Sequence, residues 1–248
     1  MGATLKRKKP RSLLTAIVYR LSKLFANNSV KFRFLLDMEW IFERLCYEHA
    51  SVHYGVENAP WRKSAVKFLS RVIKPDDAVL DLGCGYGSVS HSISLMARKV
   101  VGVDYNLESI HKARKHYQRA NLQFIHEDAL RYLNQSGEKF NVLILTHVLE
   151  HLDNPKYFLA TYANYFSYIF IEVPDFDRTF LNHFRQGVNS AQIYTDSDHV
   201  SEFDRDELCA LLSEVNLQVL SAEYRYGVQK IWAKCSENLI SDTTTIIR

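Results

Sequence analysis

The chain has 248 residues, of which 47% are hydrophobic, and its formal net charge is +3 at pH 7. This length suffices for the core of one α/β domain, with roughly 30 to 60 residues left over for an appendage. The four cysteines lack the paired spacing of a disulfide framework or a zinc site, which argues against both and favours a reducing cytoplasm; they are Cys46, Cys84, Cys209 and Cys235.

The basic residues are concentrated at the start of the sequence. Nine of the 31 precede the first acid, Asp37, which leaves 22 basic residues against 28 acidic residues for the rest of the chain. The nine are Lys6, Arg7, Lys8, Lys9, Arg11, Arg20, Lys23, Lys31 and Arg33. A body with a net negative charge does not attract polyanions in general. Nucleic acid is therefore a disfavoured partner, and any affinity for anionic lipid is expected to reside in this first segment.

Residues 1–36 are expected to form a basic amphipathic arm. Ser12 can cap a helix whose apolar residues fall on one face, with Arg20 and Lys23 outside that face. The apolar residues are Leu13, Leu14, Ile17, Val18, Leu21, Leu24 and Phe25. The helix is too short and too polar to span a membrane. It is typical either of peripheral contact with the anionic inner face of a membrane or of packing against its own domain or a second subunit in a homodimer.

A helical cap is expected over residues 37–74, with helices at 35–47 and 61–72. From residue 75 to 240, β-rich runs alternate with helical patterns, which predicts an α/β fold with a doubly wound, mostly parallel sheet. The strands are expected at 78–82, 99–103, 122–125, 140–146 and 168–173, with helices beginning near Ser88, Leu107, Leu130 and Pro155. A polar segment, a helix at 205–214 and a β-hairpin of strands 217–224 and 229–235 follow, and residues 241–248 look like a loose tail.

A glycine-rich turn follows the first strand of this domain. The run Val79-Leu80-Asp81-Leu82-Gly83-Cys84-Gly85-Tyr86-Gly87 leads from a strand through the turn into a helix. Glycines at such a turn let the backbone adopt positive φ and approach a ligand closely. The spacing is G-x-G-x-G, and Ser88 stands where a dinucleotide-binding turn needs its last glycine, which disfavours NAD and FAD.

Two acids end the next two strands. Asp104 comes seventeen residues after Gly87, where a carboxylate can accept hydrogen bonds from both hydroxyls of a ribose. The alternative is that Asp104 caps the helix that begins at Leu107. Asp128 closes the third strand and suits the amino group of an adenine. The glycine turn, Asp104 and Asp128 are thus expected at one edge of the sheet, where they can contact three parts of one nucleoside.

This ordered set of motifs resembles class I S-adenosylmethionine-dependent methyltransferases, over roughly residues 78–235. The resemblance implies a Rossmann-like seven-stranded sheet, mostly parallel with an antiparallel C-terminal strand, and S-adenosylmethionine as cofactor. It assigns the methionine part of the cofactor to the turn of Asp81, Gly83, Cys84 and Gly85. It assigns the ribose to Asp104 and Tyr105, and the adenine to Asp128 and Ala129.

The fourth strand runs into Thr146-His147-Val148-Leu149-Glu150-His151-Leu152, which resembles the V-L-E-H-L stretch of small-molecule methyltransferases. In that family the stretch borders the methyl-donor pocket. His147 is therefore expected on the cofactor side, with Glu150 and His151 as packing residues behind it.

The absence of two known sequence motifs limits the kind of atom that can accept the methyl group. The fourth strand lacks the D/N-P-P-Y sequence of amino-methylating enzymes, and no Pro-Cys nucleophile of the cytosine C5 type is present, so transfer to oxygen is favoured over carbon. Residues 171–175 and 198–203 resemble methyltransferases of sugar and polysaccharide biosynthesis, which makes His199 the candidate general base. The alternative for His199 is a surface or helix-capping role.

Four loop aspartates raise the question of magnesium: Asp175, Asp177, Asp196 and Asp198. Loop aspartates more often stabilise turns, so no metal is expected. The leading hypothesis is a cytoplasmic O-methyltransferase that acts on a saccharide or another small hydroxylated metabolite. Two alternatives are an RNA methyltransferase that uses the basic arm and a cofactor-binding scaffold without transfer activity.

Overall fold

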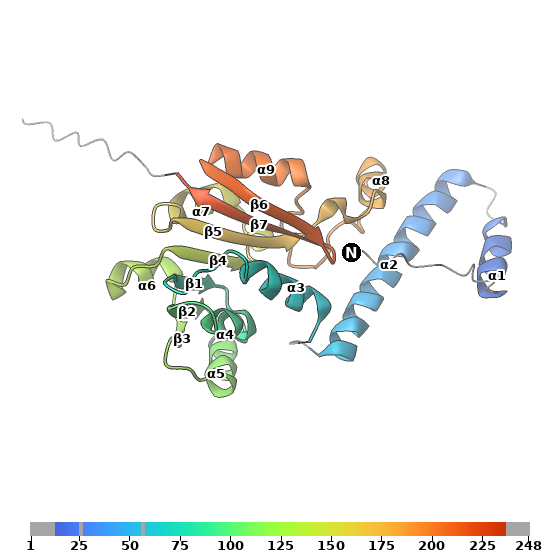
Figure 1. Ribbon diagram of the computed structural model, residues 1–248. Helices are drawn as coiled ribbons and strands as arrows, with labels where there is room; N and C mark the ends of the chain where they lie inside the picture. The colour runs from blue at the N-terminus through green and yellow to red at the C-terminus, as the bar shows by residue number, and fades with distance from the viewer. Residues whose placement is uncertain (1–12, 25–26, 56–57, 237–248) are drawn as a thin grey trace, which may run out of the picture.

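The computed structural model describes residues 13–24, 27–55 and 58–236. Its centre is a seven-stranded sheet with the strand order β3-β2-β1-β4-β5-β7-β6 (Figure 1). The strands are β1 (Ala78–Leu82), β2 (Lys99–Asp104), β3 (Leu122–His126), β4 (Val142–Thr146), β5 (Tyr168–Pro174), β6 (Leu217–Arg225) and β7 (Val228–Cys235). The predicted Rossmann-like α/β fold is confirmed.

Strand direction follows the expected pattern. Strands β1 to β5 pair in parallel, whereas β7 is antiparallel to both of its neighbours, β5 and β6. The chain passes from β1 outward to β2 and β3 and then returns to β4 on the other side of β1. Such a reversal opens a crevice at the carboxyl ends of the central strands, where ligands bind in open α/β sheets. The glycine turn after β1 lies at this reversal.

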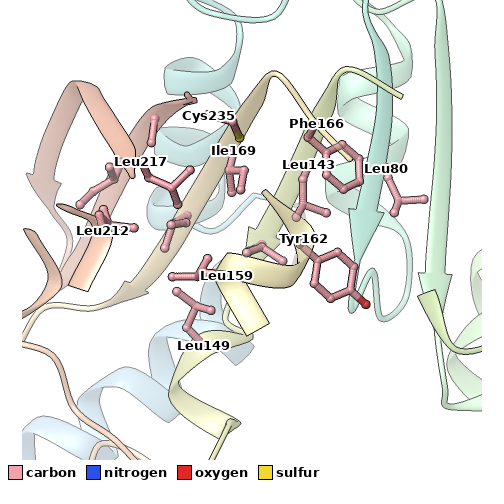
Figure 2. Close-up of a cluster of buried hydrophobic side chains, with 14 of the residues drawn as sticks. Leu80, Leu143, Leu149, Leu159, Tyr162, Phe166, Ile169, Leu212, Leu217 and Cys235 are labelled. Atoms are coloured by element: carbon pink, nitrogen blue, oxygen red, sulfur yellow. The ribbon is translucent and has the colours of Figure 1, made fainter. Parts of the chain in front are cut away.

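Helices cover both faces of the sheet because neighbouring residues of each buried strand point to opposite sides. Leu80, Leu143 and Ile169 face one core, together with residues of α7 and α9 (Figure 2). Val79 and Val142 face the second core, together with residues of α3, α4 and α5. The helices are α3 (Pro60–Leu69), α4 (Ser88–Ser94), α5 (Leu107–His116), α6 (Ala129–Ser136), α7 (Pro155–Tyr162) and α9 (Arg205–Glu214).

Two further helices, α1 (Leu13–Ser22) and α2 (Asn28–Tyr54), precede this domain and lie to one side of the sheet (Figure 1). Helix α2 begins at a side-chain cap, in which Asn27 accepts hydrogen bonds from two backbone N–H groups, and ends at Tyr54, with Gly55 as its C-cap. It is longer at both ends than the predicted helix and runs through residues 36 and 37, where the arm was expected to meet the cap. The expected cap at Ser12 and the tail lie outside the described residues. No helix within those residues is long and apolar enough to cross a membrane.

The polar segment after β5 contains structure that its sequence did not predict. A short 3₁₀ helix (Phe176–Arg178) is followed by α8 (Leu181–Gly187). Arg185 of α8 is fully buried and donates hydrogen bonds to Asn182, to the Leu36 carbonyl and to the Glu39 carboxylate. A buried charge needs such partners, so this guanidinium joins α8 to α2. Isolated arginines in polar sequence do not reveal such a role in advance.

We expect replacement of Gly87 by alanine to lower the free energy of unfolding by roughly 2–4 kcal/mol. Gly87 has a φ of +82°, and an added Cβ would lie 2.5 Å from Cζ of Phe124. Gly137 also has positive φ, but nothing lies within 4 Å of its added Cβ. Gly137→Ala should therefore show only the backbone cost, about 1 kcal/mol. Urea unfolding of both variants measures the difference; equal losses would contradict the contact with Phe124.

Candidate functional site

The glycine turn and Asp104 meet at the carboxyl edge of β1 and β2. Gly83 and Gly85 have φ values of +71° and +53°. The Asp104 carboxylate accepts hydrogen bonds from the backbone N–H of Gly85 at 2.8 Å and of Asn106 at 2.7 Å. Helix α5 is capped by Asn106, whose side chain accepts from the Ser109 N–H at 3.0 Å. Asp104 is therefore not the cap of α5, and its carboxylate lies against the turn.

Asp81 lies beneath the same turn. It is 1% exposed, and the Ser90 hydroxyl donates to its Oδ2 at 2.5 Å. Burial raises the pKa of Asp81 to about 6, against the lowering effect of the Ser90 hydrogen bond. A cation placed beside this carboxyl group would stabilise its charged form and lower its pKa. The amino group of an amino acid ligand is a cation of this kind.

Asp81→Asn should stabilise the ligand-free protein at neutral pH by about 3 kcal/mol, because the folded-state pKa lies above the unfolded value. The sign follows from proton binding. Between about pH 4 and pH 6 the unfolded state gives up its proton while the folded state keeps it, so the stability of the wild type falls through this range and is lowest above pH 6, where the folded state holds a buried charge. The gain should therefore vanish near pH 4. Urea unfolding at pH 4 and 7 measures it; a loss of stability at pH 7 would contradict this account.

The remaining cofactor-side predictions have different surroundings. The Cys84 side chain is buried in the second core, where burial raises the pKa of its thiol, so only its backbone can reach a ligand. Tyr105 is 86% exposed. Asp128 is exposed and caps α6 by accepting from the Arg131 N–H at 2.9 Å, and Ala129 is buried behind it. The capping role leaves the adenine assignment of Asp128 a prediction.

His147 is held between two buried glutamates at the end of β4. Its φ is +55°, its Nδ1 lies 2.9 Å from Oε1 of Glu150, and its Nε2 lies 3.6 Å from Oε1 of Glu172. Burial lowers the pKa of His147, but the two carboxylates outweigh burial and the pKa lies above its ordinary value. Among the described residues, Oε2 of each glutamate has no hydrogen-bond partner. Glu150 is fully buried behind His147, where it was predicted, and also contacts the imidazole ring.

Arg62 of α3 is a member of the site that sequence reasoning missed. Burial raises the pKa of Asp81 and Glu172, and the carboxylates raise that of His147; the positive charge of Arg62 opposes each of these shifts without reversing it. Its Nε is buried and lacks a hydrogen-bond partner within the described part of the chain. An arginine in a helix before β1 carries no sequence signal for this position. The guanidinium group can bind a carboxylate of a ligand.

A cavity of about 890 Å³ lies beside His147. His151 and His199 line it, and α2 contributes Trp40, Arg44 and Tyr47 to another part of its wall. A volume of this size holds a small-molecule ligand. The cavity therefore brings His147, at the end of β4, into one space with the segment where the acceptor was expected.

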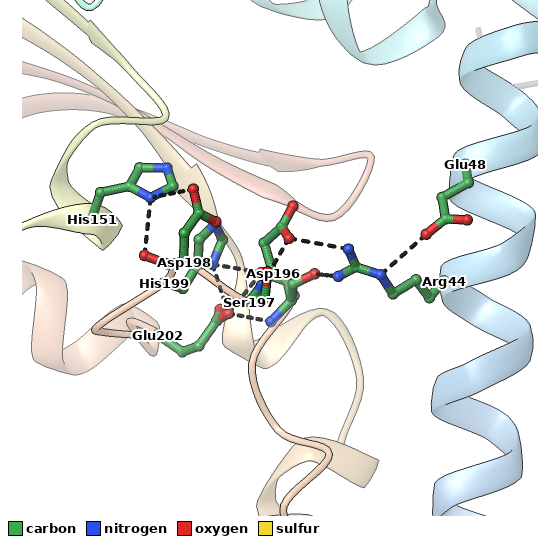
Figure 3. Close-up of polar contacts among 9 residues, drawn as sticks. Arg44, Glu48, His151, Asp196, Ser197, Asp198, His199 and Glu202 are labelled. Atoms are coloured by element: carbon green, nitrogen blue, oxygen red, sulfur yellow. Dashed lines mark hydrogen bonds and ion pairs between the residues drawn. The ribbon is translucent and has the colours of Figure 1, made fainter.

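His199 is oriented by a carboxylate at the edge of this cavity (Figure 3). Its Nδ1 lies 3.0 Å from Oε1 of Glu202, and the two side chains are 7% and 5% exposed. A carboxylate accepts hydrogen bonds, so Nδ1 carries the proton and Nε2 keeps a lone pair. Burial lowers the pKa of His199, but Glu202 outweighs it and the pKa is raised. A His–Glu pair of this kind can take a proton from a hydroxyl group.

The loop that carries His199 is fixed by α2. Arg44 donates hydrogen bonds to the Thr195 carbonyl and, at 3.1 Å, to Oδ1 of Asp196 (Figure 3). Thr195 in turn donates its hydroxyl to Oε1 of Glu202 at 2.6 Å. Arg44 thus acts on the position of His199 through the loop, over a sequence separation that gives no signal in advance.

The loop aspartates have partners of their own. Asp175 accepts from Arg205 at 2.7 Å, Asp177 from His183 at 2.7 Å, and Asp196 from Arg44. A different group, Glu150, His151 and His199, offers three ligand atoms within 4.8 Å of one another. Two imidazoles and a carboxylate suit a transition metal better than magnesium. Sequence reasoning considered the aspartates and missed this group, because its members come from two distant segments.

Comparison with known proteins finds a family and relatives. Residues 57–222 match the family described as methyltransferase domain. A ubiquinone biosynthesis O-methyltransferase of Pseudoalteromonas translucida is 33% identical over 82 residues, 32% of this chain and 35% of that protein. An uncharacterized RNA methyltransferase of Mycoplasma mobile is 38% identical over 80 residues, 31% of this chain and 22% of that protein. The chain thus spans about a fifth to a third of the length of these curated relatives.

Solved structures extend the likeness across the fold. Magnesium protoporphyrin IX methyltransferase from Synechocystis, with bound SAH, has a TM-score of 0.54 and 16% identity, covering 90% of this chain and 95% of that chain. A SAM dependent methyltransferase from Aquifex aeolicus has a TM-score of 0.52 and 16% identity, covering 68% of this chain and 88% of that chain. At such identities the likeness establishes the fold.

Proposed function

This chain belongs to the methyltransferase domain family, and we propose that it transfers a methyl group from S-adenosylmethionine to a hydroxyl oxygen of a saccharide or another small hydroxylated metabolite. The observation that carries the proposal is a cavity that begins at the end of β4 and contains a histidine held by a buried glutamate. His147, at the end of β4, and the His199–Glu202 pair border one space of about 890 Å³. Two of the similar solved structures support the choice of donor: one has SAH bound, and the other is a SAM dependent methyltransferase.

The residues at the carboxyl edge of the sheet fit this donor. Gly83 and Gly85 form a turn of positive φ that a ligand can approach, and Asp104 lies against it. Arg62 has a buried nitrogen without a partner among the described residues, which suits the carboxylate of a methionine part. Asp81 suits its ammonium group. When bound, the donor supplies a methyl group on a positively charged sulfur that is open to in-line attack by an oxygen.

The acceptor side supplies position and a base. Because the displacement needs the attacking oxygen held in line behind the methyl group, the walls of the cavity account for much of the rate enhancement. A sugar hydroxyl is a weak acid, so it also needs a proton acceptor as it attacks. His199 is that catalytic residue in our proposal: Nε2 takes the proton, and Glu202 holds Nδ1 and stabilises the imidazolium that forms.

The RNA alternative has one specific observation in its favour, the Mycoplasma mobile relative. The excess of acid outside the arm argues against it. Transfer of a labelled methyl group into a cell extract, which is then separated into glycan, lipid, RNA and protein, decides between them. Label in the glycan, lipid or small-molecule fractions supports our proposal. Label in RNA alone would establish the alternative, and binding of SAH without any labelled product would favour a scaffold.

We expect methyl transfer to continue in EDTA, because the displacement itself needs no Lewis acid and His199 supplies the base. The competing role for Glu150, His151 and His199 is to bind a transition metal ion. The two roles exclude each other at Nε2 of His199. Turnover is measured with labelled donor before and after dialysis against EDTA. Loss of turnover that Zn²⁺ or Mn²⁺ restores would assign these three residues to a metal instead.

A further inference from the structure

Helices α1 and α2 present a large exposed apolar surface. On α2, large apolar residues recur at intervals of four and seven along the side that faces away from the domain; this outer stripe comprises Val30, Phe34, Ile41, Leu45 and Val52. They are 37–82% exposed. Helix α1 adds Leu13, Ile17 and Leu21, which are 44–77% exposed. Contiguous exposed apolar surface of this extent marks an interaction site.

The surface is also cationic. Arg20, Lys23, Lys31 and Arg33 lie among these apolar residues, and the sequence has no Asp or Glu before Asp37. Arg20, Lys23 and Arg33 are exposed, so their charged ends are free to reach lipid phosphates while their stems cover apolar surface. Apolar side chains and cations on the same helices are the two features that hold a helix at an anionic bilayer surface. We propose that α1 and the outer stripe of α2 dock the protein on an anionic membrane.

Two other occupants fit this surface less well. A grip on RNA phosphates would use the four cations but gain nothing from exposed Leu13, Ile17 or Ile41. A second copy of the chain would bring the four cations before Asp37 against the same four cations of its partner, which costs free energy. An anionic bilayer satisfies both the apolar and the charged groups.

The other side of α2 connects this surface to the acceptor. Trp40, Arg44 and Tyr47 line the cavity, whereas Ile41 and Leu45 of the outer stripe do not and are 37% and 43% exposed. One rigid helix therefore has the membrane on one side and the acceptor cavity on another. This step rests on the proposed function: the acceptor is a hydroxylated group attached to a lipid, which enters the cavity from the bilayer surface.

Vesicle binding by the full-length chain tests the docking surface. We expect sedimentation with vesicles of phosphatidylcholine and phosphatidylglycerol, much weaker binding to phosphatidylcholine alone, and weakening by salt. Reversing four cations should lower the partition coefficient at least about tenfold: Arg20→Glu, Lys23→Glu, Lys31→Glu and Arg33→Glu. The matched control reverses four exposed cations of the sheet domain and should bind like the wild type: Lys115→Glu, Arg119→Glu, Lys139→Glu and Lys234→Glu.

The apolar contribution is tested with Phe34→Ser, Ile41→Ser and Leu45→Ser combined, which should also lower binding at least about tenfold. Equal binding of the wild type to both kinds of vesicle would overturn the proposal, as would equal losses in the two charge variants. A dimer that the serine variant converts to a monomer, without vesicle binding, would assign the stripe to a second copy. Competition by RNA at equal phosphate concentration would assign the cations to RNA.

The docking surface and the proposed function can fail separately. Vesicle binding without methyl transfer would support the docking surface and contradict the proposed reaction. Transfer to a water-soluble acceptor without vesicle binding would support the proposed reaction and contradict the docking surface. When both hold, label should appear in the lipid fraction, and the four-cation variant should lose transfer to vesicle-bound acceptor but keep its affinity for SAH.

Discussion

Asp104→Ala should weaken the binding of S-adenosylhomocysteine at least about a hundredfold. If its carboxylate accepts hydrogen bonds from two ribose hydroxyls, the two charged hydrogen bonds contribute about 3 kcal/mol or more together, and 1.4 kcal/mol corresponds to a factor of ten. Asp104→Asn keeps one oxygen acceptor and should lose less. Isothermal titration calorimetry with the nucleoside measures both variants.

The control for Asp104 is its neighbour Asn106. Asp104 also accepts the N–H groups of Gly85 and Asn106, so its loss can loosen the glycine turn. Asn106→Ala removes the cap of α5 at a cost of about 1 kcal/mol of stability, but it leaves the carboxylate in place. Its affinity for the nucleoside should stay close to that of the wild type. If both variants bind the nucleoside as the wild type does, the ribose assignment is wrong.

His199→Gln should lower the rate of methyl transfer by about 10² to 10⁴, the usual contribution of a general base, and leave nucleoside affinity unchanged. The measurement is single-turnover transfer to the acceptor identified by fractionation. His183→Ala is the matched control, because His183 also pairs with a carboxylate, Asp177, but lies on the exposed side of α8. Full activity of His199→Gln would remove His199 from the chemistry.

The pH dependence of the rate gives a second readout for His199. A base works only when neutral, so the rate should rise with pH through the pKa of His199. Glu202 raises that pKa, so Glu202→Gln should move the rising part of the profile to lower pH. The maximal rate should also fall, because the amide no longer holds the imidazole in the correct tautomer. An unshifted profile would show that Glu202 does not act on the titrating group.

The sheet was predictable because its signals are local. Each parallel strand is a short apolar run between polar turns, and the observed bounds of β1, Ala78–Leu82, are those that the sequence predicts. The meeting of Asp104 with the glycine turn followed for the same reason. Asp81 and Asp104 stand at the ends of β1 and β2, the glycines come directly after β1, and the carboxyl ends of parallel strands meet at one edge. The place of a residue at the end of a strand therefore predicts its place at the edge of the sheet.

The acceptor side was less accessible to sequence reasoning. His199 could be singled out, but Glu202, Arg44 and Arg62 could not, because their contacts join segments of unrelated local pattern. Arg44 reaches Thr195 across 151 positions. The burial of Glu150 is likewise a property of the packed structure, since a glutamate in a helical or loop pattern reads as a surface residue.

The residues proposed to bind the donor and those proposed to bind the acceptor come from different segments, which has an evolutionary consequence. In the proposed function the donor binds at the edge of β1, β2 and β3, whereas the cavity proposed for the acceptor is lined by α2, by residues of the segment between Pro174 and His199 and by the turn between β6 and β7. The two sets of residues are separate along the chain, with His147 where they adjoin. Selection can therefore exchange the acceptor by remodelling α2 and that segment, while the donor half is inherited intact.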